Sequence, residues 1–221
     1  MSAEIQDRPA PRWRRRKEAR PGEILAAALE IFGDRGYEAT RLSDVARKAG
    51  CTKGTIFLYY ENKAELFKAA LREAMMPLVT ENERLVETHR GSTRDLLAKL
   101  LRLRWDHMMR NRFSGLIKLM LAETRNYPEL AKFYNDEFID RNQVLIRNVL
   151  QQGVDRGEFK PMDLPHVARF VVAPMVFAVL WRHAFEHAVD APFSLEEYFD
   201  NSLQLILDGL STGRVPEPVA T

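Results

Sequence analysis

The chain has 221 residues, of which 46% are hydrophobic and 29% charged, and its formal net charge at pH 7 is +2. This length is enough for a substantial hydrophobic core in one or two domains. No run of eighteen apolar residues occurs and the first residues are charged and proline-rich, so we expect neither a transmembrane helix nor a secretory signal. The single cysteine excludes an internal disulfide and suits a cytoplasmic protein.

Positive charge is concentrated towards the N-terminus. Residues 1–67 carry 13 lysines and arginines against 10 acidic residues, whereas the rest of the chain is slightly acidic. Residues 1–16 contain five arginines and little apolar content, so we expect a flexible basic arm there. Such an arm can be a solvated flank, or it can follow DNA phosphates or enter the minor groove, and the sequence leaves both interpretations open.

The first helix is predicted to begin at Pro21, because proline at the first helical position forfeits no needed N–H. Its apolar residues recur at helical spacing and form one stripe. Gly36 is expected to end it. The residues of the stripe are Ile24, Leu25, Ala28, Leu29 and Phe32.

Residues 40–59 indicate two short helices joined by a tight turn. Thr40 is a candidate N-cap for the first of them. Gly50 suits the left-handed position that ends this helix. Thr52 is a candidate N-cap for the second helix, which we expect over residues 53–60. A capped helix, a glycine turn and a second helix with a polar, cationic front are typical of a DNA-binding helix-turn-helix.

This stretch resembles the tetracycline-repressor (TetR) family of transcriptional regulators. The resemblance covers about residues 17–77. The residues that match the family pattern are Phe32, Gly36, Tyr37, Thr40, Val45, Ala46, Ala49, Gly50, Cys51, Thr52, Gly54, Thr55, Ile56, Tyr59, Tyr60, Asn62, Lys63 and Leu66. Phe57 departs from the pattern, because the family usually has a tyrosine there whose hydroxyl touches a DNA phosphate.

The outward face of the motif supplies the candidate DNA contacts. Lys53 can donate to guanine or to a phosphate, and Thr55 can touch a phosphate or a thymine methyl group. Lys63 opens the next helix, where its ammonium and the helix N-terminal N–H groups suit a phosphate. The candidate DNA-binding residues are Thr40, Arg41, Ser43, Thr52, Lys53, Gly54, Thr55, Leu58, Tyr59 and Lys63.

The rest of the chain also shows helical periodicity and no convincing strand. A fourth helix is expected from about residue 63 to 88, with a kink near Pro77. Five more helices are expected at residues 93–110, 113–125, 128–152, 164–188 and 195–210, before a flexible tail at 213–221. The prediction is an all-α fold with nine helices, in which residues 17–77 form the helix-turn-helix domain and residues 78–212 the C-terminal domain. The TetR resemblance implies the same architecture.

The helices expected after residue 93 are rich in methionine and aromatic residues. Each of these side chains can be ordinary core, but adaptable side chains also line cavities for apolar guests. The TetR resemblance implies an effector cavity here, so we expect a small apolar or amphipathic effector and neither a cofactor nor a metal. The candidate pocket residues are Trp105, Met108, Met109, Phe113, Met120, Phe133, Tyr134, Phe138, Met175 and Phe177.

The last two helices carry more apolar residues than a single core requires. This excess predicts a self-complementary surface for a homodimer, although packing within the chain will account for some of it. The family forms a four-helix bundle from the equivalent pair of helices. The candidate interface residues are Phe170, Val171, Pro174, Ala178, Trp181, Leu203, Ile206, Leu207 and Leu210.

A rival hypothesis comes from His183, Glu186 and His187, which form the His-x-x-Glu-His string of inverted zinc peptidases. Two histidines four residues apart share a helix face and could bind a metal. A metal-dependent hydrolase is therefore the alternative from another class. We expect no enzyme, because the string continues an apolar stretch suited to a dimer surface and no further catalytic residues accompany it.

The sequence therefore predicts a ligand-responsive repressor that binds a palindromic operator in double-stranded DNA as a homodimer. The ligand is expected to shift the spacing of the two recognition helices through the helix at residues 63–88. A transcriptional activator of the same fold is the alternative within this class. No membrane partner is expected.

Overall fold

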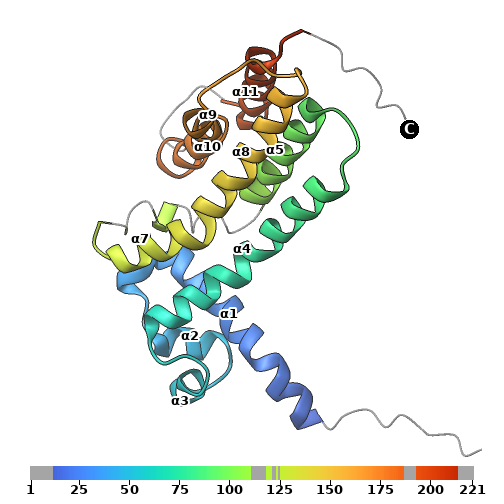
Figure 1. Cartoon of the computed structure of the whole chain (residues 1–221). Helices are drawn as coiled ribbons and strands as arrows, with labels where there is room; N and C mark the ends of the chain where they lie inside the picture. The colour runs from blue at the N-terminus through green and yellow to red at the C-terminus, as the bar shows by residue number, and fades with distance from the viewer. Residues whose placement is uncertain (1–11, 111–117, 121–122, 124, 187–192, 214–221) are drawn as a thin grey trace, which may run out of the picture. The chain divides into compact units, whose positions relative to one another are not determined.

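The structure is a computed structural model that describes residues 12–110, 118–120, 123, 125–186 and 193–213 (Figure 1). The described residues are predominantly helical, and the only extended pairing among them is an isolated antiparallel bridge between Phe159 and Ser211. The all-α prediction is confirmed. The chain divides into two compact units, Met1–Leu71 and Arg72–Thr221, so the boundary lies six residues before the predicted one at residue 77.

The N-terminal unit is built around a cluster of three aromatic rings. It contains α1 (Arg12–Ala39), α2 (Leu42–Lys48), α3 (Lys53–Phe57) and the beginning of α4 (Lys63–Thr88). Phe67 of α4 packs edge-on against Phe32 and Tyr37, with ring centroids 4.8 and 5.2 Å apart. Because these rings come from both ends of the unit's sequence, they join α1 to α4. Buried residues of every helix complete this core, namely Ile24, Ala28, Val45, Ala46, Ile56, Leu66, Ala70 and Leu71.

The C-terminal unit is a bundle in which α5 is the central helix. Its elements after α4 are α5 (Thr93–Arg110), α7 (Pro128–Tyr134), the π-helical η1 (Asn135–Ile139), α8 (Asp140–Asp155), α9 (Leu164–Phe170), α10 (Ala173–Ala184) and α11 (Leu195–Leu210). Figure 1 shows α8 and α11 alongside α5, with α9 and α10 next to them. Trp105 of α5 stacks on Phe199 of α11 at 4.4 Å, and its indole N–H donates to Glu196 at 2.7 Å. This bond satisfies the polar end of a buried aromatic side chain.

Where a helix boundary has a local capping signal, it lies where the sequence predicted it. The bounds of α4, α5 and α11 match the predicted ranges, and Pro77 lies inside α4. Ser92 accepts the N–H of Asp95 at the start of α5, as expected for an N-cap. The predicted helix at residues 113–125 falls mostly outside the described residues; within it, 118–120 and 123 are helical and 125 is in a turn.

Three predicted helices differ from the structure in their extent or regularity. α1 begins at Arg12 instead of Pro21, so the end of the predicted flexible arm is helical, and Pro21 lies inside the helix although a proline there removes a backbone hydrogen bond. The helix expected at residues 128–152 is continuous but contains the π-helical turn η1. The helix expected at 164–188 is divided at Val171 and Val172, because Pro174 has no N–H to continue the hydrogen-bond pattern.

The segment Leu164–Ala184 is the one described stretch long and apolar enough to cross a membrane, with a mean hydropathy of 1.6. The sequence prediction missed it. Length and composition are weak evidence, because the core helices of other proteins pass the same test. Here the segment is interrupted by the turn between α9 and α10, and Ala168 and Ala178 are fully buried in the core.

Candidate functional site

The turn between α2 and α3 has the geometry that the glycine predicted. Gly50 has a φ of +60°, which places it in the left-handed region. The N–H of Cys51 donates to the carbonyl of Ala46 at 2.9 Å, and the N–H of Gly50 donates to that of Arg47 at 3.2 Å. This pair of bonds is a Schellman motif, which satisfies the last carbonyls of α2 and directs the chain into α3.

Helix α3 is short and firmly capped. The hydroxyl of Thr52 accepts the N–H of Thr55 at 3.1 Å, so the predicted N-cap is confirmed. The helix ends at Phe57, three residues before its predicted end, and a turn carries the chain onward. Ile56 is fully buried and anchors the helix to the core.

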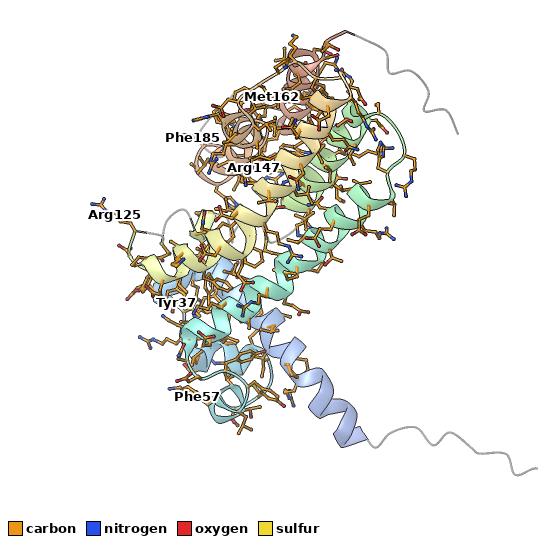
Figure 2. The ribbon with its side chains drawn as sticks, viewed as in Figure 1. Tyr37, Phe57, Arg125, Arg147, Met162 and Phe185 are labelled. Carbon is orange, nitrogen blue, oxygen red and sulfur yellow. The ribbon has the colours of Figure 1, made fainter. Side chains whose placement is uncertain are left out.

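The outer face of α3 and the turn after it exposes most of the predicted DNA contacts together. Lys53 and Gly54 are exposed, Leu58 is 81% exposed and Tyr59 is also exposed. Figure 2 labels Phe57 on this side of the unit, where 47% of its surface is exposed. The Lys53 ammonium lies 5.5 Å from the centre of the Phe57 ring. An ammonium, a phenol and two apolar side chains are thus available to one partner surface.

Thr40 does not cap α2 as predicted. Its side chain is buried, and its hydroxyl donates to the carbonyl of Gly36 at 2.6 Å. The position before α2 is occupied by Arg41, which makes no side-chain capping bond. The Thr40 hydroxyl, which was expected to cap α2, instead bonds to the carbonyl of Gly36, where the backbone of α1 leaves the helical conformation. Arg41 and Ser43, the other candidates on this helix, are exposed.

Lys63 binds the protein's own backbone. Its ammonium donates to the carbonyls of Tyr37, Glu38 and Thr40 at 2.9, 3.2 and 3.4 Å, and lies 4.5 Å from the Tyr37 ring centre. Carbonyls at a helix end have no partner inside the helix, and an ammonium has three donors to offer them. A DNA phosphate would therefore have to replace one of these three bonds, so the phosphate contact of Lys63 stays a prediction.

Two cations of the helix-turn-helix are not neutralised by neighbours. Arg35 and Arg47 both form salt bridges with Asp44, and Lys48 pairs with Glu30. By contrast, Arg41 and Lys53 form no salt bridge with any described residue. An anionic partner would therefore meet no described carboxylate that competes for these two side chains.

The C-terminal unit contains a cavity of about 240 Å³. Its wall is formed by Met75, Leu78, Arg104, Met108, Met120, Tyr134, Phe138, Ile139, Asn142, Gln143, Val172, Met175 and Val176. Five of these were among the predicted pocket residues, namely Met108, Met120, Tyr134, Phe138 and Met175. The cavity is thus enclosed mainly by apolar side chains from α4, α5, η1, α8 and α10.

The other predicted pocket residues do not lie on this wall. Trp105 is in the core against Phe199, and Met109 packs against the same core. Phe133 lies under the Arg72 guanidinium, whose carbon is 4.7 Å from the ring centre. Phe177 is 41% exposed and belongs to the molecular surface. Phe113 lies outside the described residues.

The polar residues of the cavity were missed. The Arg104 guanidinium is buried, which lowers its pKa, and its Nη1 donates to the side-chain oxygen of Asn142 at 2.5 Å. Arg104 Nε and Gln143 Oε1 are buried and have no hydrogen-bond partner among the described residues. Burial raises the pKa of Tyr134, whereas the nearby Arg104 charge lowers it. Arg104 interrupts the apolar face of α5 between Leu101 and Met108, and this was the signal in the sequence.

Two family models match the chain. The model of bacterial regulatory proteins of the TetR family matches residues 24–70, and that of the tetracycline repressor-like C-terminal domain matches residues 87–192. The chain belongs to the TetR family of bacterial regulatory proteins. The predicted family is confirmed.

Relatives and solved structures agree with this membership. An uncharacterized HTH-type transcriptional regulator of Mycobacterium tuberculosis is 31% identical over 139 residues, which are 63% of this chain and 65% of that protein's length. The repressor KstR2 of Mycolicibacterium smegmatis is 25% identical over 205 residues, or 87% of this chain and 91% of that repressor. FadR from Bacillus subtilis, solved in complex with stearoyl-CoA, has the same fold, with a TM-score of 0.71, 22% identity and coverage of 86% and 98%.

The surface predicted for dimerisation of this TetR-family chain needs correction. Val171, Ala178, Ile206 and Leu207 are buried in the chain's own core, so they are not available to a second copy. Pro174, Trp181, Leu203 and Leu210 are half-buried, and Phe170 is 65% exposed. The exposed apolar side chains of α9 to α11 and their ends are Phe170, Val176, Phe177, Leu180, Phe185, Phe193 and Leu205 (Phe185 in Figure 2).

The His-x-x-Glu-His string lies at the end of α10. His183 is inside the helix and Glu186 follows it, whereas His187 lies outside the described residues. Within the described part of the chain, no group of three or more His, Cys, Asp or Glu side chains is placed to hold a metal. The family models match the residues of the helix-turn-helix and most of those that line the cavity.

Proposed function

We propose that this TetR-family protein is a transcriptional repressor that binds operator DNA as a homodimer and is released by a small apolar or amphipathic effector. The observation that carries the proposal is the outer face of α3. A Schellman turn and a Thr52 cap fix this short helix, and Lys53, Leu58 and Tyr59 extend from it or from the following turn into solvent. A side chain held this way can enter the major groove.

The chemistry of this face suits DNA. Lys53 can donate to the two acceptors of guanine, and Leu58 can contact a thymine methyl group. Arg41 on the neighbouring helix can bind a phosphate, because no described acidic side chain neutralises it. Phe57 lacks the hydroxyl of the tyrosine usual in the family, so it offers only apolar contact.

A homodimer would place two such faces on one DNA molecule. The exposed apolar side chains of α10 and α11, including Phe177, Leu180 and Leu205, form the surface that a second copy would cover. A two-fold dimer binds a site whose half-sites repeat as a palindrome. A palindromic operator is therefore part of the proposal.

The effector would act through α4. Met75 and Leu78 of this helix line the cavity, and the same helix begins at Lys63 in the N-terminal unit. Salt bridges join α4 to the other walls: Arg72 to Glu137 in η1, and Glu83 to Arg141 in α8. A ligand that changes the packing of these walls would change the position of α4. A coupling of about 1–3 kcal/mol is typical of such control.

The names of the relatives support this mode of action. KstR2, 25% identical, is named a transcriptional repressor. The FadR structure holds stearoyl-CoA, an amphipathic ligand. In our chain an apolar cavity with a few polar groups suits a guest of the same broad class.

The test is a selection of bound fragments from genomic DNA, followed by affinity measurements on the selected site and on random DNA. Lys53→Ala should reduce the preference for the selected site by about 1–3 kcal/mol, because it removes a contact with base edges. Thr55→Ala should act in the same direction. Lys132→Ala is the control, since it removes one exposed lysine from α7.

Each outcome of this binding test has a different interpretation. Fragments that share a palindrome and bind two chains support the homodimer. If wild-type protein enriches no sequence, the proposed function fails. If Lys53→Ala weakens the selected site and random DNA equally, Lys53 contacts only the backbone.

A further inference from the structure

We infer that the cavity binds a small amphipathic carboxylate, whose charged group pairs with Arg104 and whose apolar part lies among Met75, Leu78, Met108, Phe138 and Met175. This inference rests on the proposed function only in taking the cavity as the effector site. It adds the charge, the binding residue and the approximate size of the effector.

Arg104 differs in its surroundings from the arginines of its unit that pair with carboxylates. Arg72, Arg94, Arg102 and Arg141 each pair with at least one carboxylate, and Arg102 pairs with two. All four are at least partly exposed to solvent. The Arg104 guanidinium, by contrast, is buried, and it forms no salt bridge with a described residue. A buried cation without a counter-ion is costly, so its position calls for an anion from outside the chain.

The guanidinium is oriented for such an anion. The side-chain nitrogen of Asn142 donates to the Phe138 carbonyl at 2.7 Å, which turns the Asn142 oxygen towards Arg104 Nη1. Because Nη1 is engaged, the Nε side of the planar group is left without a described partner. An arginine binds a carboxylate with two parallel N–H donors, and an edge that includes Nε can provide them.

Neighbouring groups can complete the polar end of the site. The Tyr134 phenol also lines the cavity, and since burial raises its pKa it remains protonated and able to donate at neutral pH. The unpartnered oxygen of Gln143 can accept a hydrogen bond from water or from a hydroxyl of the ligand. The remaining walls are methionine and other apolar side chains, which adapt to the shape of a carbon skeleton.

The volume limits the size of the guest. A cavity of about 240 Å³ lies just below the range of roughly 300–1,000 Å³ that is usual for pockets of drug-sized ligands. An acid of about eight to ten non-hydrogen atoms therefore fits. Octanoate is the probe that matches this size, and hexanoate and decanoate bracket it.

The experiment is calorimetric titration of the full chain, without DNA, with hexanoate, octanoate, decanoate and 1-octanol. At least one acid should bind, and octanoate should bind tenfold or more tightly than 1-octanol, which has the same carbon skeleton without the charge. Arg104→Met should abolish this preference and Arg104→Lys should retain part of it. Arg102→Met is the matched control: it removes a guanidinium two residues away that belongs to surface ion pairs, and should leave octanoate binding unchanged.

A melting curve checks that the variants are folded. Arg104→Met should melt at or above the wild-type temperature, because replacing an unpaired buried charge by an apolar side chain is neutral or stabilising. If this variant does not fold, the comparison of octanoate with 1-octanol on wild-type protein still decides the question.

Three results would overturn the inference: no acid of the series binds, 1-octanol binds as well as octanoate, or folded Arg104→Met keeps the preference. Binding of octanoyl-CoA without binding of octanoate would also do so, since the charge would then lie outside the cavity. Because this titration contains no DNA, its failure is separate from a failure of operator binding.

Discussion

The N-terminal and C-terminal units differ in how completely their buried polar side chains are hydrogen-bonded. In the N-terminal unit, the Thr40 hydroxyl donates to Gly36, and the Lys63 ammonium donates to three carbonyls. In the C-terminal unit, Arg104, Gln143 and Asn82 have buried polar atoms without a partner among the described residues. Most buried polar groups in proteins are hydrogen-bonded, so the second pattern is the exceptional one.

The difference corresponds to what each unit has to bind. A DNA-reading helix gains affinity when its geometry is fixed before contact, because less order has to be imposed on binding. A cavity for an effector needs polar groups that a ligand can satisfy, and they stay unpaired until it arrives. The N-terminal unit is thus complete by itself, whereas the C-terminal unit keeps groups for a guest.

The largest effect is expected for Lys63→Met. The variant loses three hydrogen bonds from a charged donor, so the free energy of unfolding of the N-terminal unit should fall by about 2–3 kcal/mol. Urea denaturation measures this loss. Lys68→Met is the control on the same helix, because Lys68 forms a surface salt bridge with Glu65 and should cost less than about 1 kcal/mol.

The same variant also tests the phosphate contact. If Lys63→Met leaves stability unchanged but weakens binding to all DNA sequences and flattens the salt dependence, Lys63 is a DNA contact and the described bonds are not important for the fold. That outcome would contradict the view that the bonds of Lys63 stabilise the N-terminal unit before DNA binds.

An effect of opposite sign is expected for Asn82→Leu in the C-terminal unit. Both polar atoms of the Asn82 side chain are buried and have no partner in the described part of the chain, and leucine has the same branching. The variant should therefore raise the free energy of unfolding by about 1–2 kcal/mol. Asn142→Leu is the control and should lower it, since it removes the bonds to Arg104 and Phe138. A destabilised Asn82→Leu variant would show that Asn82 has a partner after all.

The smallest effect is expected for Gly50→Ala. An added Cβ would meet no atom within 4 Å, so the cost is that of the left-handed backbone alone, about 1–2 kcal/mol per residue and here at its lower end. Gly22→Ala is the control: its position in α1 is equally open and has an ordinary φ, so alanine should stabilise by about 0.5–1 kcal/mol. Equal effects from the two substitutions would mean that the turn before α3 is not rigid.

The sequence by itself determined the local structure of this protein. Thr52 predicted the start of α3, and Gly50 predicted the turn between the helix-turn-helix elements. These signals depend on residues within five positions of one another, so a short stretch of sequence contains all the interacting groups. The family could be predicted for the same reason, because its pattern lies in one continuous stretch.

Only the tertiary structure decided which partner a polar side chain takes and which apolar face is covered. Lys63 meets carbonyls up to 26 residues earlier, and the buried Glu158 accepts the N–H of Thr93, 65 residues away, at 2.7 Å. Val171 and Ile206 looked like interface residues and proved to be core, since helical periodicity does not tell one apolar neighbour from another. Arg104 became a candidate site residue only when folding left it buried without a carboxylate, because that depends on every helix around the cavity.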